Sequence, residues 1–505
     1  MKYDLLIKNA AVIDGTGREA FFADVAVKDG KIAEIGNDLS DASEIIDASG
    51  LMLTPGWIDS HSHSNAAVFA FPDQREKVEQ GITFSVTGQC GYSSAPSRDK
   101  DGNLFSVRDY FDAATVTPQG SGSVMLVGHT MLRLAVIGSE NRAPTREEME
   151  LMKKLLRDGM ESGALGMSFG LFYAPGAYAT VEECVELASV VAEYGGILAA
   201  HIRDERDGVI EAVDEFLKII KGSGCRGVFS HHKSAEPQNF GKVKTTVSMI
   251  KEAIDEGYDI YLDVYPYPAY ETTLLASFIP QQFHREGIKD VVDLVRDDDS
   301  RAMLRKWGLD NWGEDLGFVL VSKCPPYSQY EGLTVNEIAE KMGMDRYECA
   351  YELIRASEGV AEGFFFVMDE SDIEFVMREP RAMICTDSTV AGKSTRYHPR
   401  LRASFPRVLS HYVRERGVTS LPEMIRKMTS LPASVYGLAG KGEIKVGMDA
   451  DLCIFDYGKI KDRADFSDCT PANEGLSYVI IDGEIVARDG VHNGKRAAKV
   501  LRANL

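Results

Sequence analysis

The sequence predicts an α/β protein built on a (β/α)8, TIM-like barrel, with a small β-sandwich domain formed by both chain ends. Two observations lead to this fold class. Apolar, strand-like segments alternate with amphipathic, helix-like segments between residues 51 and 400, which indicates parallel strands joined by crossover helices. About eight such units fit in that stretch, and polar residues follow many of the strands. A doubly wound open sheet is the alternative, and the lack of a glycine-rich phosphate loop after an early strand disfavours it.

The two ends of the chain share a pattern of short strands and tight turns. The strand-like segments are 5–7, 11–13, 25–27, 451–456 and 478–486. Asp-Gly pairs among them are typical of hairpin turns. Because neither end has enough strands for a stable sheet alone, we expect residues 1–54 and 436–505 to form one composite β domain.

Residues 55–435 are expected to form the barrel. Thr145 with Glu148, and Thr180 with Glu183, have the spacing of capping boxes, which mark the N-termini of helices. Further helices are expected around 209–220 and 243–254. The expected strands between and after these helices include 83–87, 124–127, 164–169, 197–200, 227–230, 259–262 and 383–386.

Residues 280–345 interrupt the alternation. They contain the charged run 296–299 and two of the three tryptophans, Trp307 and Trp312. We interpret this stretch as an insertion after the seventh strand. Its composition fits a lid over the mouth of the barrel and a passive surface decoration equally well.

Bulk properties exclude several classes of partner. The net charge of −21 disfavours binding to nucleic acid or to an anionic membrane, and an anionic small-molecule substrate would need a local basic pocket. The sequence lacks an apolar run of about 18 residues and the apolar core of a signal peptide. The eight cysteines have no CxxC spacing, which is typical of a reducing cytoplasm. The sequence does not define an oligomeric state.

Two histidines two positions apart follow the apolar run 51–53. Residues i and i+2 of a strand point to the same side, so His61 and His63 can direct two imidazoles at one point. The chain has only 10 histidines, so this pair is a notable use of a scarce residue. The spacing therefore predicts a metal site, against the alternative of two surface histidines in a loop.

Four more potential ligands follow other expected strands of the barrel. They are Cys90 after the second strand, His201 after the fifth, His231 after the sixth and Asp387 after the eighth. Each residue alone is more often structural than functional. Because the carboxyl ends of barrel strands meet at one face, the set predicts a metal centre there.

Imidazole, thiolate and carboxylate ligands together favour Zn²⁺. Bound Zn²⁺ polarises a carbonyl group and lowers the pKa of its water to about 7, so hydrolysis of an amide or a related bond is the expected chemistry. Asp387 is the candidate general base, which would orient the attacking water and pass its proton to the leaving amine.

These residues and several surrounding motifs resemble the amidohydrolase superfamily and, within it, the D-aminoacylase (N-acyl-D-amino-acid deacylase) group. The motifs spread over essentially the whole chain. They include His61-Ser62-His63, Gly88-Gln89-Cys90-Gly91, Tyr173-Ala174-Pro175-Gly176, His201-Ile202-Arg203-Asp204-Glu205, Ser230-His231-His232-Lys233, Tyr265-Pro266-Tyr267 and His398-Pro399-Arg400. The combination is specific to the group, whereas the first motif marks only the superfamily.

The resemblance implies one zinc ion held by Cys90, His201 and His231. It further implies a second, weaker site framed by His61, His63 and Asp387, with Cys90 placed to bridge the two. Many other superfamily members bridge two metals with a carboxylated lysine from the fourth strand, but 164–169 contains no lysine. Two departures from the group pattern, Gln89 and Ser64-Asn65, remove no ligand.

The resemblance also assigns the binding of the substrate carboxylate to Lys233 and Arg400, with Tyr173 and Tyr265 as hydrogen-bonding partners. The function it implies is removal of the N-acyl group from N-acyl-D-amino acids. Hydrolysis of cyclic amides of the hydantoinase or dihydroorotase type is the first alternative, and the missing lysine counts against it. A metal-binding scaffold without catalysis is the second, and Asp387 counts against it.

Overall fold

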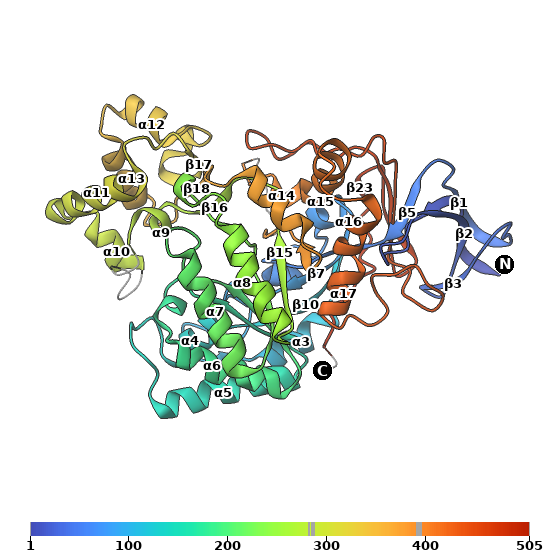
Figure 1. Ribbon diagram of the computed structural model, residues 1–505, viewed down its shortest axis with the longest axis horizontal. Helices are drawn as coiled ribbons and strands as arrows, with labels where there is room; N and C mark the ends of the chain where they lie inside the picture. The colour runs from blue at the N-terminus through green and yellow to red at the C-terminus, as the bar shows by residue number, and fades with distance from the viewer. Residues whose placement is uncertain (1, 281–282, 284–287, 390–395, 504–505) are drawn as a thin grey trace.

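Eight apolar segments form the parallel strands of a barrel in the computed structural model, which describes residues 2–280, 283, 288–389 and 396–503 (Figure 1). Around the barrel the strands follow sequence order: β6 (Trp57–Asp59), β7 (Ile82–Thr87), β10 (Gly122–Met125) continued by β11 (Val127–Gly128), β12 (Gly166–Gly170), β13 (Ile197–His201), β14 (Arg226–Phe229), β15 (Ile260–Val264) and β19 (Ala382–Ile384). Strands that are covered on both faces are apolar at nearly every position, as here. The predicted fold class is confirmed.

Backbone hydrogen bonds close the barrel. Leu126, between β10 and β11, donates its N–H to the Thr87 carbonyl at 2.9 Å and so continues the ladder of β7. At the other junction, Ser60 donates to the Ile384 carbonyl at 3.4 Å, and Ser62 pairs with Ser388 in a parallel bridge. This second junction places the ends of the first and eighth strands side by side.

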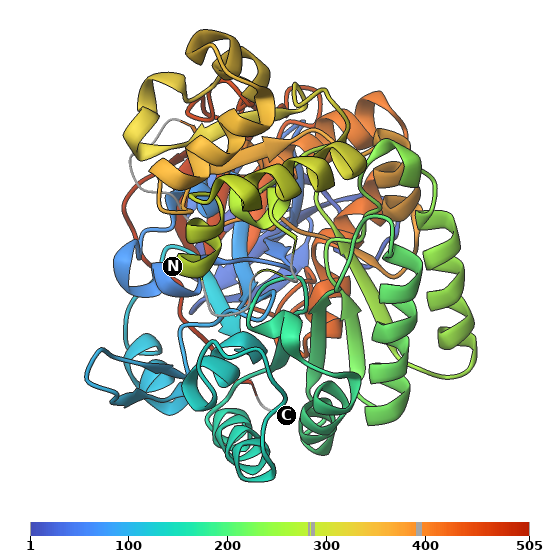
Figure 2. The ribbon, with the colours of Figure 1, turned by 90° about the vertical axis from the view of Figure 1, so that its left-hand side faces the viewer.

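Amphipathic helices cover the outside of the barrel, and Figure 2 shows green helices α7 and α8 beside the strands. The barrel region contains α1 (Ala67–Ala70), α2 (Arg75–Val78), α3 (Val107–Ala114), α4 (His129–Val136), α5 (Arg146–Glu161), α6 (Val181–Glu193), α7 (Val209–Ser223), α8 (Val243–Asp255), α14 (Glu370–Arg378), α15 (Arg400–Arg407), a π-helix (Val408–Glu415), α16 (Leu421–Met428) and α17 (Ser430–Val435). A short hairpin, β8 (Ser97–Arg98) and β9 (Leu104–Phe105), precedes α3. Three single 3₁₀ turns lie at Ser64–Ala66, Gly176–Tyr178 and Pro237–Asn239.

The two predicted capping boxes have different outcomes. At Thr145 both reciprocal hydrogen bonds with Glu148 form, so α5 begins as expected. At Thr180 only the bond from the Glu183 N–H to the threonine side chain forms. The Glu183 carboxylate instead accepts hydrogen bonds from buried Arg133 and lies 2.9 Å from His129 Nε2. The Glu183 carboxylate forms this buried ion pair instead of completing the capping box at Thr180.

The two ends of the chain pair directly in a nine-stranded sheet of order β23-β22-β21-β20-β5-β1-β2-β3, with β4 beside β1. Its strands are β1 (Tyr3–Val12), β2 (Phe21–Lys28), β3 (Lys31–Gly36), β4 (Ala42–Asp47), β5 (Met52–Pro55), β20 (Leu452–Phe455), β21 (Leu476–Ile481), β22 (Glu484–Arg488) and β23 (Val491–His492). The antiparallel ladder between β5 and β20 joins the N-terminal strands to the C-terminal ones.

The first two predicted strands, 5–7 and 11–13, are one strand rather than two. The register of β1 against β2 shifts between Ile7 and Ala10, and Asn9 has a φ of 59°. Polar Lys8 and Asn9 therefore form a bulge inside a continuous strand, where the sequence pattern suggests a break. Of the Asp-Gly pairs, Asp29-Gly30 makes the tight β2–β3 turn.

The segment between β15 and β19 forms a separate unit that contains 280–345 and begins earlier. It comprises β16 (Tyr270–Thr273), α9 (Leu274–Phe278), α10 (Ile288–Leu294), α11 (Asp298–Trp312), β17 (Val319–Lys323), a 3₁₀ segment (Pro325–Tyr330), α12 (Val335–Met342), α13 (Arg346–Ala356) and β18 (Glu362–Phe365). Residues 281–282 and 284–287 of the predicted insertion lie outside the described residues. Its role as a lid stays a prediction.

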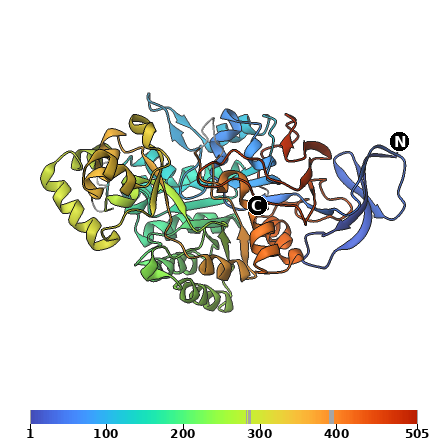
Figure 3. The same cartoon turned by 90° about the horizontal axis from the view of Figure 1, so that it is seen from above.

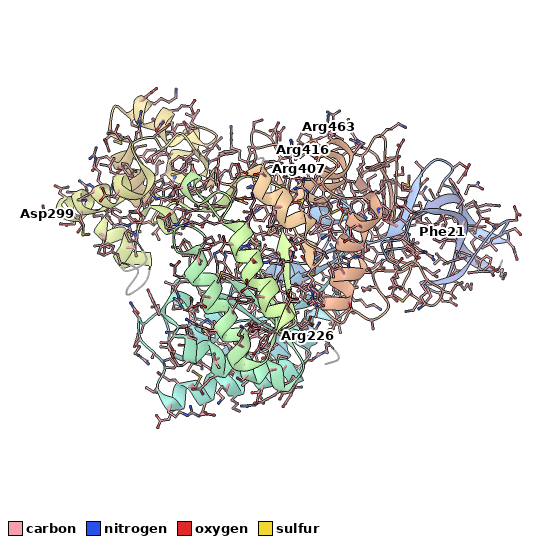
Figure 4. All side chains as sticks on the ribbon, in the orientation of Figure 1. Phe21, Arg226, Asp299, Arg407, Arg416 and Arg463 are labelled. Carbon is pink, nitrogen blue, oxygen red and sulfur yellow. The ribbon has the colours of Figure 1, made fainter. Side chains whose placement is uncertain are left out.

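The insertion unit and the β domain lie at opposite ends of the molecule, with the barrel between them (Figure 3). Asp299 of α11 and Phe21 of β2 mark these two ends in Figure 4. The insertion unit has its own apolar core, to which Phe278, Trp312 and Phe365 contribute. Among the described residues, no helix is both long and apolar enough to cross a membrane.

Candidate active site

The potential metal ligands predicted from the sequence converge at the carboxyl ends of the barrel strands. His61 and His63 follow β6, Cys90 follows β7, His201 ends β13, His231 follows β14 and Asp387 follows β19. All are buried except His63, whose side chain is 29% exposed. The parallel barrel brings them together because all its strands end at the same face.

One group of these side chains could hold a metal ion without large movements. The ligand atoms of His61, Cys90, His231 and Asp387 all lie within 4.8 Å of one another. Cys90 Sγ lies 3.3 Å from His61 Nε2 and 3.4 Å from His231 Nε2. Asp387 Oδ1 lies 3.5 Å from His61 Nε2 and 3.1 Å from His63 Nε2.

A second group shares His231 and adds His201 and Glu205. Glu205 Oε1 lies 2.9 Å from His231 Nδ1, and Glu205 Oε2 lies 3.9 Å from His201 Nε2. His201 Nδ1 is buried and has no hydrogen-bond partner among the described residues. A buried nitrogen of this kind needs a partner, and a metal ion would provide one.

Three of the potential ligands have strained backbone conformations. Cys90, His231 and Asp387 have φ values of 51°, 36° and 48°, in the left-handed region that side-chain-bearing residues rarely adopt. Each such residue costs about 1–3 kcal/mol and is typical of functional sites. At Gly91, which follows Cys90, an added Cβ would lie 2.6 Å from Thr130 Oγ1 and 2.9 Å from Gly170 N, so the tight turn requires glycine.

The electrostatics of the group favour the ionised forms of its thiol and its carboxylate. Burial opposes ionisation of the Cys90 thiol, but the positive charges of His61 and His231 hold its pKa well below the usual value. Burial also opposes ionisation of Asp387, but the guanidinium of Arg400 and the charge of His231 hold its pKa well below the usual range. A thiolate, a carboxylate and several imidazoles form a donor set that fits Zn²⁺.

The two cations predicted to bind a substrate carboxylate are each paired with a protein carboxylate. Lys233 Nζ donates to Glu205 Oε1 at 2.7 Å and lies 2.8 Å from His231 Nδ1. Arg400 Nη1 donates to Asp387 Oδ2 at 2.7 Å. Arg400 Nε is buried and has no hydrogen-bond partner among the described residues, so it retains a donor.

The two predicted tyrosines lie close to these groups. Tyr265 lies below both cations, with its ring centre 5.5 Å from Lys233 Nζ and 5.0 Å from Arg400 Cζ. Its hydroxyl donates to Met368 Sδ at 3.2 Å. The Tyr173 ring packs against the imidazole of His201 at 5.1 Å between centres.

A cavity of about 230 Å³ opens onto the convergent side chains. It is lined by His63, Cys90, Tyr92, Phe172, Tyr173, His201, Glu205, Arg206, His231, Lys233, Ala235, Tyr270, Glu271, Thr272, Ser277, Asp387 and Arg400. Barrel loops and the insertion both contribute, the latter through β16 and α9. A second cavity of about 280 Å³ adjoins it past His63 and Asp387.

A buried ion pair supports the loop that carries Asp387. Lys77 Nζ donates to Asp59 Oδ2 at 2.8 Å and to Thr386 Oγ1 at 2.9 Å, and its side chain is 0% exposed. Asp59 also accepts hydrogen bonds from the N–H and hydroxyl of Thr386, at 2.8 and 2.7 Å. The first and eighth strands are thus tied together directly below His61 and Asp387.

Sequence reasoning missed four residues of this site. Glu205 stands inside a motif that was noted only for its histidine, and Arg206 follows it. Asp263 is the penultimate residue of the seventh strand and accepts a hydrogen bond from the His231 N–H at 2.5 Å, and its place near the end of that strand could have indicated it. Glu271 reaches the cavity from the insertion, and no local pattern indicates that contact.

Comparisons with known proteins agree with this geometry. The profile of the amidohydrolase family matches residues 44–303 and 381–487. A D-aminoacylase of Alcaligenes xylosoxydans xylosoxydans is 34% identical, over 99% of this chain and 97% of that protein. An N-acyl-D-glutamate deacylase of the same organism is 35% identical, over 95% and 93%.

A solved structure matches along its whole length. It is the N-acyl-D-glutamate deacylase of Bordetella bronchiseptica, in complex with zinc and a phosphonate inhibitor that mimics the tetrahedral intermediate of the reaction. It has a TM-score of 0.85 and 34% identity, and the match covers 100% of both chains.

Proposed function

The chain belongs to the amidohydrolase family, and we propose that it is a zinc-dependent hydrolase that removes the acyl group from N-acyl-D-amino acids. The products are a carboxylate and a free D-amino acid. One observation carries the proposal most directly: a cysteine between two strand-end histidines lies in a cavity that also holds Asp387 and two paired cations. Relatives with this chemistry in their names match nearly the whole chain.

We assign the tightly held zinc ion to Cys90, His201 and His231, and a second, weaker site to His61, His63 and Asp387 with Cys90 shared. The orphan nitrogen of His201 and the low pKa of the Cys90 thiol support the first set. When bound, Zn²⁺ polarises the scissile carbonyl and makes water a nucleophile near neutral pH.

Asp387 is the group that we assign to proton transfer. Its carboxylate is ionised, because its pKa lies well below the usual range despite burial. One oxygen faces His63 and His61, and the other accepts from Arg400 at 2.7 Å. The first oxygen can accept a proton from the attacking water and deliver it to the leaving amine, while Arg400 fixes the orientation of the carboxylate.

Lys233 and Arg400 are assigned to the α-carboxylate of the substrate. Both cations lie near the Tyr265 ring, and Arg400 Nε still has a free N–H. Arginine can bind a carboxylate through two N–H groups, whereas lysine acts as a point charge. We assign Tyr173, whose ring packs against the imidazole of His201, together with Tyr265 as hydrogen-bonding partners of the α-carboxylate.

The test is hydrolysis of paired N-acetyl-D- and N-acetyl-L-amino acids by zinc-loaded protein, with the zinc content measured in parallel. We expect release of acetate from D isomers, loss of activity after chelation and recovery on addition of zinc. Activity on L isomers alone, or on neither, would overturn the proposal. Ring opening of hydantoin or dihydroorotate with no activity on linear substrates would favour a cyclic-amide hydrolase instead.

We also propose a cytoplasmic location. All eight cysteines are buried and none forms a disulfide. This supports a reducing compartment. Non-reducing electrophoresis of protein extracted under thiol-blocking conditions should show no disulfide-linked species, and a stable intramolecular disulfide would contradict the proposal.

A further inference from the structure

Three cations line the main cavity, and one of them is poorly paired. Lys233 and Arg400 each donate to a carboxylate at 2.7 Å. The carboxylates nearest to the third cation, Arg206, are Glu236 at 3.6 Å and Asp204 at 3.8 Å. Within the described part of the chain, the Arg206 guanidinium makes no hydrogen bond. A guanidinium carries five N–H donors, so this group can still bind an anion.

Arg206 is held in place by aromatic rings rather than by acids. Its guanidinium carbon lies 5.9 Å from the ring centre of Phe172, in a barrel loop, and 5.3 Å from that of Trp312, in the insertion unit. Rings at these distances attract a cation by its charge and leave its in-plane N–H groups available. The side chain is 22% exposed, so its position is restricted but open to the cavity.

The neighbouring carboxylates do not neutralise Arg206 completely. Glu236 accepts a hydrogen bond from Gln238 Nε2 at 2.6 Å, and Asp204 accepts two from backbone N–H groups, those of Arg206 itself at 2.7 Å and Gly208 at 3.3 Å. Both acids are thus engaged elsewhere. An oxygen that reached Arg206 through the cavity could make the charge-assisted bond that neither of them makes.

The cavity continues in two directions from the convergent side chains. Past Phe172 and Arg206 it continues into a groove between the barrel and the insertion unit. Past Asp387 it continues into the second cavity, where Glu271 and Glu362 lie. Glu271 has no ion-pair partner within 4.0 Å among the described residues and so presents an acidic group there. A ligand with an anionic side chain would therefore place it toward Arg206.

We propose that Arg206 binds an acidic group on the side chain of the substrate, so that the preferred substrates are N-acyl-D-amino acids with a second carboxylate, of the D-glutamate or D-aspartate class. This inference rests on the proposed function, which assigns Lys233 and Arg400 to the α-carboxylate and leaves Arg206 for another anion. An apolar side chain would cover Arg206 without pairing its charge, which is unfavourable.

The experiment compares near-isosteric substrates. The ratio of kcat/KM for N-acetyl-D-glutamate to that for N-acetyl-D-glutamine is measured with zinc-loaded wild-type protein and with Arg206→Gln. The ratio should favour glutamate in the wild type and fall by roughly 10- to 100-fold in the variant, the size of one charge-assisted pair. Activity on the glutamine substrate should fall less than activity on the glutamate substrate, because a neutral amide gains less than a carboxylate from the charge of Arg206.

Two further variants separate the contact from long-range charge and from packing. Arg206→Lys keeps the cation and should retain most of the preference. Lys218→Gln removes a cation from the same groove, where Lys218 pairs with Asp214 at 2.6 Å, and should leave the ratio unchanged. Matching zinc contents and melting temperatures among the variants would exclude misfolding as the cause.

Some results would overturn the inference while leaving the proposed function intact. One is a wild-type preference for N-acetyl-D-glutamine or N-acetyl-D-leucine over N-acetyl-D-glutamate. The other is an equal loss of kcat/KM on the glutamate and glutamine substrates in Arg206→Gln, which would indicate that Arg206 acts in packing the insertion unit. Failure to hydrolyse any N-acetyl-D-amino acid would contradict the proposed function itself.

Discussion

The two sides of the candidate metal site repeat one arrangement of charged groups, but different residues support each side. On the side of the first and eighth strands, Asp387 lies between His63 and Arg400. On the side of the fifth and sixth strands, Glu205 lies between His231 and Lys233. In both, a carboxylate pairs with a cation at 2.7 Å and faces a histidine.

The two carboxylates differ in which of their oxygens are engaged by neighbouring groups. Asp387 follows a strand end with a φ of 48°, its loop is tied to a buried ion pair, and one oxygen faces the cluster. Glu205 uses a single oxygen, Oε1, to accept from Lys233 and to approach His231. We therefore propose two different roles for these carboxylates: Asp387 moves a proton, and Glu205 orients a metal ligand. Removing each should have distinct consequences.

The largest expected effect is that of Asp387→Asn. The amide keeps the size of the side chain but cannot accept a proton at the oxygen that faces His61 and His63. We expect kcat to fall by roughly 10²- to 10⁴-fold, because the general base catalysis that we assign to Asp387 is lost. The tightly held zinc should remain at about one ion per chain, as measured by elemental analysis of the purified variant.

The matched control is Asp462→Asn. Asp462 also pairs with an arginine, Arg407 at 3.2 Å, and accepts from the Ser410 hydroxyl at 3.0 Å, but it lies outside the cavity. This control should retain turnover. If Asp387→Asn kept its zinc and more than a tenth of wild-type kcat, Asp387 would not be the proton-transfer group.

The buried Lys77–Asp59 ion pair supports the loop that carries Asp387, and removing it should have the second largest effect. Lys77→Met leaves Asp59 as a buried carboxylate without its cation, which should destabilise the protein by about 3–5 kcal/mol. Adding Asp59→Asn should restore part of the loss, because the uncompensated charge is then removed. Denaturant titrations of the single and double variants measure both effects.

Lys427→Met is the comparison for Lys77→Met. The Lys427 side chain is also 0% exposed, but it bonds to backbone carbonyls of Glu379 and Ala382 rather than to a buried acid. It should lower stability without lowering kcat, whereas Lys77→Met should lower both. An equal kcat in the two variants would show that the Asp59–Lys77 pair does not position Asp387.

The alternation of apolar, strand-like segments with amphipathic, helix-like segments made most of the barrel predictable. A strand covered on both faces is continuously apolar and ends where the chain turns polar, so the sequence indicates both its course and the residue at its end. The bulge at Lys8 and Asn9 was not predictable in this way, because two polar residues in sequence suggest the end of a strand although the strand continues through them. The role of Glu183 was not predictable either, because a tertiary ion pair competes with the local cap.

The site was predictable only where its residues follow strands. His61, Cys90, His201, His231 and Asp387 lie at strand ends, and the barrel brings them together. Residues that act from elsewhere carry no such signal.

Lys77 is the clearest example of a residue that supports the site without following a strand. It lies on short α2 and meets Thr386 across 309 positions of sequence. Glu271 and Trp312 reach the cavity region from the insertion, whose packing on the barrel no periodicity describes.

The smallest expected effect is that of Glu205→Gln, which tests whether the second side only orients a ligand. Burial opposes ionisation of Glu205, but the charges of Lys233, His201 and His231 hold its pKa well below the usual value, so the carboxylate is charged at neutral pH. The neutral amide can still occupy the space and accept a hydrogen bond from Lys233, but it cannot form an ion pair with that cation.

Outer residues that orient metal ligands typically change metal affinity or activity by about 10- to 100-fold when replaced. We therefore expect Glu205→Gln to weaken zinc binding by that factor, measured by competition with a chromogenic chelator. Because we assign no proton transfer to Glu205, kcat at saturating zinc should stay within about tenfold of wild type. A loss as large as that of Asp387→Asn at full zinc occupancy would mean that both carboxylates act on the substrate and that the two sides of the site are functionally equivalent.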